Sequence, residues 1–169
     1  MGDVVIRRIR PADAPLLRDV RLRALATDPA SFASTYEREA AFAPEAWEEW
    51  AAGSAAGDDW ATLLALRDEE PVGIVTGARD ENERSVFHVF SMWVAPEMRR
   101  EGIGRRLLTD IETWMSSSGG TAVELSVTNQ AAAALQLYER AGYAANGQVD
   151  ESRHTSGLLE IGLRKRLLA

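Results

Sequence analysis

Apolar residues recur along this chain with two periods, and the alternation between them predicts a mixed α/β fold. Segments with apolar or β-branched residues at every second position, or in short continuous runs, predict strands at 4–9, 60–67, 72–78, 85–94, 122–127, from 143 onward, and at 158–163. Segments with apolar residues three or four apart predict helices at 11–28, 44–53, 103–115 and 130–141. Residues 30–42 are interpreted as loop or irregular helix.

The order of these elements is β-α-α-β-β-β-α-β-α-β-β within one domain, 1–169. Three consecutive strands precede the third helix, so the order excludes a doubly wound parallel sheet built only from βαβ units. The segment 85–94 is rich in Val, Phe and Trp, which predicts a central strand buried on both faces. Gly119-Gly120 and Gly142 are expected to end the last two helices.

The composition restricts the chemistry. The 169 residues suit one domain that needs no metal or disulfide to fold. The chain has no cysteine, which excludes a thiol nucleophile, and its two histidines, His88 and His154, stand alone, so no metal site is expected. The first ten residues lack the apolar core of a secretory signal, and no segment approaches the ~20 apolar residues of a membrane helix. The expected location is therefore the cytoplasm, away from membranes.

The net charge of -7 argues against a nucleic-acid partner. The first 83 residues carry nine basic and seventeen acidic side chains, whereas the remainder carries ten basic and nine acidic ones. An acidic half and a more basic half would suit a cationic acceptor and an anionic cofactor. Unevenly charged, solvated helices would give the same counts.

The segment Arg99-Arg100-Glu101-Gly102-Ile103-Gly104 lies between a predicted buried strand and a predicted helix. The first N–H groups of a helix have no internal partner and carry the positive end of its dipole, so they form an anion site. Glycines allow a phosphate to approach the backbone. Arg99, Arg100, Arg105 and Arg106 add positive charge.

Several anion loops share such glycines. A nucleoside-triphosphate loop requires Gly-Lys-Ser/Thr, whereas Arg105 follows Gly104 here. A dinucleotide loop requires a third glycine where Leu107 stands, and an opening βαβ unit. A coenzyme A diphosphate loop and an ordinary helix start flanked by solvated arginines both remain.

A second segment, from Leu125 to Tyr143, contains a strand that ends at Asn129, a helix that carries Tyr138, and a Gly-aromatic pair. Asn129 could cap the helix or bind a ligand with its amide. Tyr138 could pack in the interior or present its phenol to a ligand.

Together the two segments resemble the GNAT N-acetyltransferase superfamily. Its Arg/Gln-x-x-Gly-x-Gly/Ala motif is matched by Arg99, Gly102 and Gly104. Its asparagine and its Leu-Tyr-Glu-x-x-Gly-Phe/Tyr segment are matched by Asn129 and by 137–143. The similarity is strong from Val86 to Tyr143 and only topological before that.

The resemblance implies acetyl-CoA as cofactor and a mainly antiparallel sheet with a splayed gap between the strands 86–94 and 122–127. The backbone of Met92, Trp93 and Val94, together with Asn129, would bind the pantetheine arm in that gap. The pyrophosphate would bind the N–H groups of 99–104, near Arg105. Tyr138 would be the general acid.

The resemblance does not supply a general base, because the central strand has no carboxylate. His88 and Ser91 are its polar candidates, although His88 could equally be a core histidine. Other acids that could line the acceptor side are Glu37, Glu39, Glu81 and Glu83.

The acceptor is expected to be an amine that binds against the first two helices. An aromatic group there either forms its pocket or docks these helices: Phe32, Tyr36, Phe42, Trp47 and Trp50. Three functions remain: acetylation of a small cationic amine, acetylation of a protein lysine or N-terminus, and non-catalytic sensing of acyl-CoA. Related proteins are often homodimers, which leaves the oligomeric state open.

Overall fold

The computed structural model describes residues 2–152 and 156–168, and its strands form a seven-stranded sheet in the order β1-β2-β3-β4-β5-β7-β6. Neighbouring strands are antiparallel except β4 and β5, which are parallel. The strands are β1 (Val4–Arg8), β2 (Trp60–Arg67), β3 (Glu70–Arg79), β4 (Val86–Val94), β5 (Ala122–Thr128), β6 (Ala144–Glu151) and β7 (Leu159–Arg166). The helices are α1 (Ala14–Thr27), α2 (Tyr36–Ala40), α3 (Pro44–Ser54), α4 (Ile103–Ser117) and α5 (Ala132–Arg140). The expected mixed, mainly antiparallel fold is confirmed.

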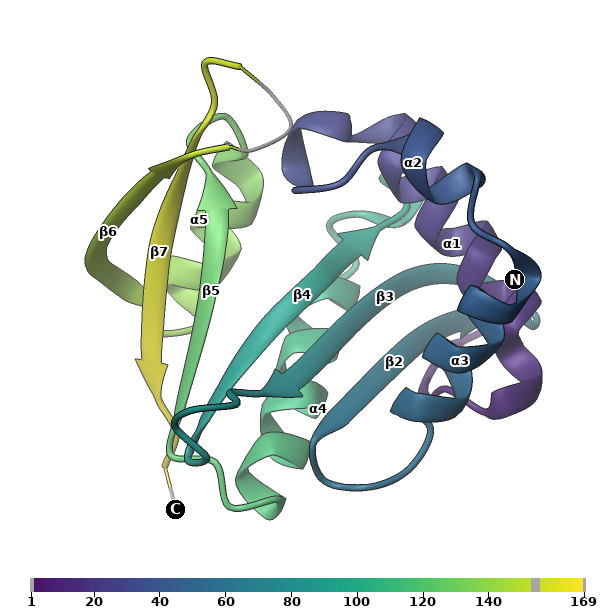
Figure 1. Ribbon diagram of the computed structural model, residues 1–169, viewed down its shortest axis with the longest axis horizontal. Helices are drawn as coiled ribbons and strands as arrows, with labels where there is room; N and C mark the ends of the chain where they lie inside the picture. Colours follow the sequence, from purple (N-terminus) through teal and green to yellow (C-terminus); the bar gives the residue numbers. More distant parts are fainter. Residues whose placement is uncertain (1, 153–155, 169) are drawn as a thin grey trace.

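The sheet opens between β4 and β5. Their ladder covers only Val86 to His88, which stand opposite Ala122 to Glu124. Beyond this point the two strands diverge, and Figure 1 shows the resulting wedge between the β2–β4 half and the β5–β7 half. The sequence resemblance implied this gap, and its place is confirmed.

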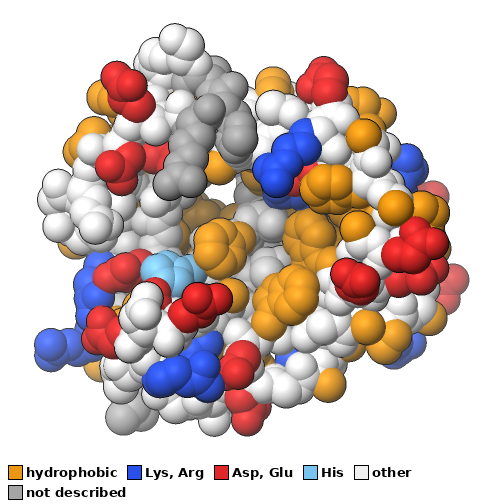
Figure 2. Space-filling model, in the orientation of Figure 1, with side chains coloured by type: hydrophobic (Ala, Val, Ile, Leu, Met, Phe, Trp, Pro, Cys, Tyr) orange, Lys and Arg blue, Asp and Glu red, His pale blue; other side chains and the backbone are white. Residues whose placement is uncertain are grey.

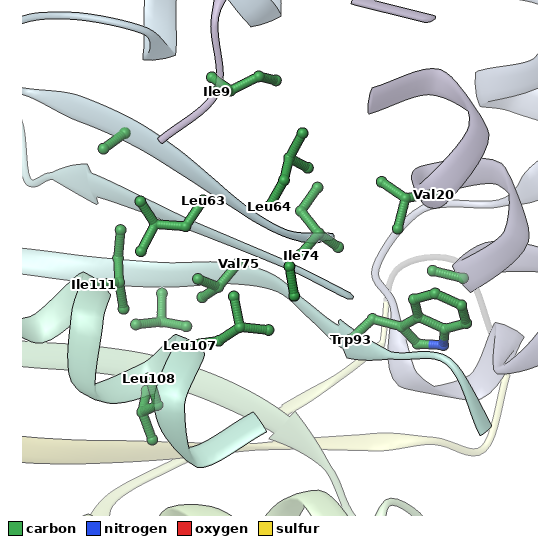
Figure 3. Packing of buried hydrophobic residues seen from close by; sticks show 14 of the residues in the cluster. Ile9, Val20, Leu63, Leu64, Ile74, Val75, Trp93, Leu107, Leu108 and Ile111 are labelled. Carbon is green, nitrogen blue, oxygen red and sulfur yellow. The ribbon is translucent and has the colours of Figure 1, made fainter. Parts of the chain in front are cut away.

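The core has one layer on each face of the β2–β4 half (Figure 3). Because side chains alternate along a strand, Leu63 and Leu64 enter different layers. Leu63 lies on the face that α4 covers with Leu107 and Ile111, whereas Leu64 lies on the face that α1 covers with Val20.

Glycines let α4 approach the sheet closely. A Cβ atom on Gly77 would lie 2.6 Å from Met115 Cε and 2.9 Å from Ile111 Cγ1. A Cβ on Gly73 would lie 3.1 Å from Leu107 Cδ1. The small residues of β3 therefore fix the position of α4, and with it the loop that precedes the helix.

Some predictions about the elements need correction. The central strand is not buried on both faces throughout: His88 is partly exposed, and Phe90 is 52% exposed where β4 has left its ladder with β5. The predicted helix 130–141 begins at Ala132, and Asn129 does not cap it: the N-cap is Ala131, with no side-chain hydrogen bond. Within the loop 30–42 a short helix forms, and Thr35 caps it through Arg38 N–H. Gly142 follows α5 at φ +98°, as predicted for a C-terminal glycine.

Candidate acyl-transfer site

The loop before α4 presents a run of free backbone donors. Gly102, at φ +78°, is the N-cap of α4, and Arg100 before it is also left-handed at φ +67°. The first helical bond runs from Arg106 N–H to the Gly102 carbonyl. Across the described chain, no backbone N–H of residues 100–105 donates a hydrogen bond. Donors of this kind, at the positive end of a helix dipole, are suited to bind an anion.

Gly104 connects this loop with both sides of the gap. A Cβ atom on Gly104 would lie 3.4 Å from Met92 Cε of β4 and 3.4 Å from Leu137 Cδ2 of α5. The glycine loop and the tyrosine-bearing helix, which are some thirty residues apart in sequence, therefore meet at the open end of the gap.

The edge of β4 that faces the gap carries unpaired donors. Ala95 donates its N–H to the Val72 carbonyl of β3 at 2.9 Å. Because successive peptide groups point to opposite edges of a strand, the N–H groups of Val94 and Met92 face the gap. The Val94 carbonyl accepts a hydrogen bond from Arg99 Nε at 3.0 Å. The Trp93 side chain lies elsewhere: it is buried under α1 and donates to Asp28 at 2.8 Å.

The arginines of the loop differ in their surroundings. Arg99 is held by Asp28, 2.7 Å from its Nη2 atom, and so braces β4 against the end of α1. Arg100 is exposed. Arg105 borders a small depression of about 100 Å³ beside α5, together with Arg140 and Lys165. Glu101 pairs with Arg67 at 2.9 Å, which offsets the negative charge that it brings to the loop.

Across the gap, β5 ends in two polar residues. Asn129 accepts the Leu159 N–H with its side-chain oxygen at 3.2 Å, and its own N–H bonds the Leu159 carbonyl. Neither of these bonds uses the side-chain NH2 group of Asn129. The adjacent Thr128 hydroxyl is buried and has no partner among the described residues. The sequence did not single out Thr128, because its burial depends on the sheet.

Tyr138 lies on α5 with its ring buried against Tyr143, at 5.6 Å between ring centroids. Tyr143 is fixed in turn by a 2.7 Å hydrogen bond to Glu112 of α4. Burial raises the pKa of the Tyr138 phenol above its ordinary value, so the group stays protonated at neutral pH. Its hydroxyl has no hydrogen-bond partner among the described residues, and the residue as a whole is 6% exposed.

A pocket of about 460 Å³ lies on the α3 side of the sheet, next to the gap. Two rows of residues cross the sheet beneath it: Trp60, Ala78 and His88 in one, and Thr62, Thr76 and Phe90 in the other. Helix α3 supplies the remaining wall with Ala46, Glu49 and Trp50. On the face drawn in Figure 2, hydrophobic side chains border a hollow in the middle, and several acidic side chains surround it.

His88 stands at the edge of this pocket and is not a core histidine. It is directly opposite the pocket residue Ala78, and its ring centroid is 6.0 Å from that of Phe90. Its Nε2 atom lies 2.7 Å from Asp80 Oδ2. The side chain is partly exposed. The other histidine, His154, lies outside the described residues.

Ser91 lines the same pocket from a β-bulge, where its φ is +56° and the β3–β4 register shifts. Its hydroxyl accepts from Arg21 Nη1 at 3.3 Å. Arg21 also donates twice to Glu39, at 2.8 and 2.9 Å, in a buried ion pair between α1 and α2. Both carboxylate oxygens of Glu39 therefore accept hydrogen bonds from Arg21. The other three predicted acids do not line the pocket: Glu37, Glu81 and Glu83.

The aromatic residues of the first helices mainly dock them. Trp47 and Phe32 are buried, and Phe42 packs on Trp47 at 5.7 Å between centroids. Trp50 stacks on Trp47 at 5.9 Å and also lines the pocket. Sequence reasoning missed Trp60 and Glu49, since only the pairing of β2 and the packing of α3 bring them together.

The residues that the structure describes, 2–152 and 156–168, provide neither a metal-binding cluster nor a membrane-spanning helix. No group of three or more His, Asp or Glu side chains there could hold a metal ion. No helix in that part is long and apolar enough to span a bilayer.

Comparison with known proteins places this geometry in context. The sequence model of the acetyltransferase (GNAT) family matches residues 21–143. A GNAT-family acetyltransferase from Streptococcus pneumoniae is 24% identical, with 98% of this chain and 100% of that one covered and a TM-score of 0.85. A ribosomal-protein-alanine N-acetyltransferase from Brucella melitensis is 23% identical, with 96% and 99% covered and a TM-score of 0.80. A putative acetyltransferase from Salmonella typhimurium, solved with its cofactor acetyl-CoA, is 18% identical, with 99% and 96% covered and a TM-score of 0.74.

Proposed function

Since the chain belongs to the GNAT acetyltransferase family, we propose that it moves the acetyl group of acetyl-CoA directly to a primary amine of a small molecule. The observation that carries this proposal is the position of the free N–H groups of residues 100–105 at the open end of the β4–β5 gap. An anion site next to an unpaired strand edge suits a ligand that has a diphosphate at one end and an amide-rich arm at the other.

The residues present fit the diphosphate. Residues 100–105 offer N–H donors, and no atom lies within 4 Å of the place where a Cβ of Gly102 would be. The exposed Arg100 adds charge, whereas Arg99 acts through the loop, because its guanidinium already binds Asp28 and the Val94 carbonyl. We assign Arg100 to charge neutralisation and Arg99 to positioning.

The residues on the two sides of the gap fit the arm. On β4, the N–H groups of Met92 and Val94 would bond its amides as a neighbouring strand does. On the other side of the gap, the Asn129 amide nitrogen offers further donors.

When acetyl-CoA is bound, the amine nitrogen bonds to its thioester carbonyl carbon, the carbon–sulfur bond breaks, the amine loses a proton to a base, and the sulfur receives one. We assign the second proton to Tyr138, whose buried phenol stays protonated and whose hydroxyl has no hydrogen-bond partner among the described residues. Direct attack agrees with a chain that has no cysteine to carry the acetyl group.

His88 is the base that the geometry supports best. Nε2–H donates a hydrogen bond to the Asp80 carboxylate, so Nδ1 is the ring nitrogen left to take a proton from the amine. Asp80 is then a positioning residue. Ser91 is the weaker candidate, since its hydroxyl accepts from Arg21, and it would act through water.

A thiol-release assay tests this function. Wild-type protein is mixed with acetyl-CoA and a panel of small amines, and free coenzyme A is titrated with a thiol reagent; the chain contributes no thiol background. We expect amine-dependent release and an acetylated product by mass spectrometry. Peptides with a free lysine or N-terminus form a second arm, and turnover confined to them would replace the small-molecule assignment. Binding of acetyl-CoA without turnover in either arm would indicate a sensor.

A further inference from the structure

The acceptor pocket has apolar walls and few polar groups. Trp50, Trp60 and Phe90 border it, and Ala78 lies in its floor. The Thr76 hydroxyl in the floor already shares a 3.0 Å hydrogen bond with Thr62. The part of an acceptor molecule that enters this space therefore contacts aromatic faces and methyl groups. Any hydrogen bonds that it made to water are lost on entry, and the pocket offers few groups to replace them.

The aromatic walls are fixed before any acceptor binds. Trp50 donates its Nε1–H to Thr62 at 3.2 Å, and stacking on Trp47 holds its plane. Trp60 lies directly over Gly53 of α3, where a Cβ atom would stand 2.6 Å from its Cζ3 atom. A rigid apolar site selects for shape because little ordering is left to occur on binding.

The charges at the pocket favour a cation and disfavour an anion. Among the described residues that line it, Glu49 is charged and negative, and no lysine or arginine is present. Arg21 touches the pocket wall at Ser91 and Trp50, but its donors already serve both oxygens of Glu39 and the Ser91 hydroxyl. A carboxylate or phosphate on the acceptor would therefore lie near Glu49 without a partner.

We infer that the acceptor is a primary amine on a flat or branched apolar body with no acidic group, and this inference rests on the proposed acetyl transfer. The ammonium group is attracted by Glu49 and by the faces of Trp50 and Trp60 before it loses its proton. The body fills the space above Ala78. Amino acids, which carry a carboxylate next to the amine, and polyamines, which lack an apolar body, are poor acceptors.

Matched amine pairs test the inference. We compare kcat/KM for 2-phenylethylamine with that for phenylalanine, which differs by one carboxylate, and with that for putrescine, which is a cation without the ring. We expect 2-phenylethylamine to exceed each of the others by at least about 100-fold, in the range that one unpaired polar group or a lost apolar contact produces. Equal values, or a preference for phenylalanine or putrescine, would overturn the inference.

Two variants locate the effect. Ala78→Leu should fill the pocket and raise the KM for 2-phenylethylamine by about tenfold or more, since a few extra methyl groups decide acceptance in such a pocket. Phe90→Ala removes a half-exposed ring and should raise the same KM. An unchanged acceptor KM in both folded variants would contradict the assigned pocket.

The inference about the acceptor and the proposed acetyl transfer would be contradicted by different results. If acetyl-CoA is turned over with putrescine or phenylalanine in preference to the arylalkyl amine, acetyl transfer stands and the inference about the acceptor falls. If no amine supports release of coenzyme A, the proposed function itself falls. Acetyl-CoA affinity, measured by calorimetry in wild type and Ala78→Leu, separates damage to the pocket from damage to the fold.

Discussion

The Oδ2 atom of Asp80 lies 2.7 Å from the Nε2 atom of His88, across the turn that leads into β4. The same carboxylate accepts the backbone N–H groups of Asn82 and Glu83 through its other oxygen, at 2.8 and 2.7 Å. The turn therefore fixes the carboxylate, and the carboxylate orients an imidazole at the edge of the pocket beside α3.

This pair predicts two unequal losses of activity. His88→Gln should lower kcat by about 100-fold, because a general base contributes on the order of 10²–10⁴. Asp80→Asn should lower kcat less, by about tenfold, since the base remains but loses its fixed orientation. Added imidazole should restore part of the activity of His88→Gly. Glu83→Gln in the same turn is the control, and an unaltered kcat in His88→Gln would exclude His88 as base.

The pair also predicts a pH dependence of folding. Hydrogen bonds from His88 and from two backbone N–H groups lower the pKa of Asp80 to about 2. A carboxyl group with a depressed pKa stabilises the fold above its unfolded pKa of about 4, and this contribution is lost as pH falls from about 4 to about 2. Urea midpoints of wild type and Asp80→Asn should therefore differ at pH 5 and converge towards pH 2. Parallel curves would contradict the assignment.

Tyr138 should be needed for turnover and not for binding. Tyr138→Phe removes a hydroxyl that has no partner and keeps the buried ring against Tyr143, so the protein should fold with little change in stability. We expect kcat to fall by about 100-fold, as for loss of a general acid. The Kd of the variant for acetyl-CoA should stay within a factor of about two of the wild-type value. Tyr143→Phe is the matched control on the neighbouring ring. A variant that turns over at the wild-type rate would remove Tyr138 from the chemistry.

The buried pair of Arg21 and Glu39 should be important for stability. Their side chains are 9% and 6% exposed, and each satisfies the other. Glu39→Gln leaves a buried guanidinium without its counter-charge, which should lower the free energy of unfolding by about 3 kcal/mol. The double variant Arg21→Met/Glu39→Leu should recover much of that loss. Urea denaturation measures both, and equal stability of Glu39→Gln and wild type would show that the charge is compensated elsewhere.

Much of the architecture follows from patterns within single segments. The period of apolar residues located most elements, and the glycine loop was identified by Gly102 and Gly104 before a helix. The sheet order, the divergence of β4 from β5 and the position of β7 between β5 and β6 depend on long-range pairing. No local periodicity encodes such pairing.

The site shows the same division. The family resemblance implied Tyr138, and His88 was a candidate because it is polar and lies on the central strand. Asp80, Trp60 and Glu49 were identified only when the turn, β2 and α3 were placed against the pocket. For Asn129 the sequence allowed two interpretations, a helix cap or a side chain that binds the ligand. The cap interpretation was wrong because α5 starts three residues later and Asn129 bonds to Leu159 instead.

The proposed acetyl transfer depends on the loop 99–104, which we propose binds the diphosphate of acetyl-CoA. Gly104→Glu places a negative side chain between Met92 and Leu137, beside the free N–H groups of the loop. Thr113→Glu adds the same charge on an exposed position of α4 and serves as control. Circular dichroism and urea denaturation establish that both variants are folded.

Calorimetric titration of coenzyme A into these proteins is the most direct test. We expect binding to wild type and to Thr113→Glu with similar Kd values, and an affinity for folded Gly104→Glu that is weaker by at least about 100-fold, or about 2.7 kcal/mol. Equal affinity of Gly104→Glu and wild type would contradict the diphosphate site.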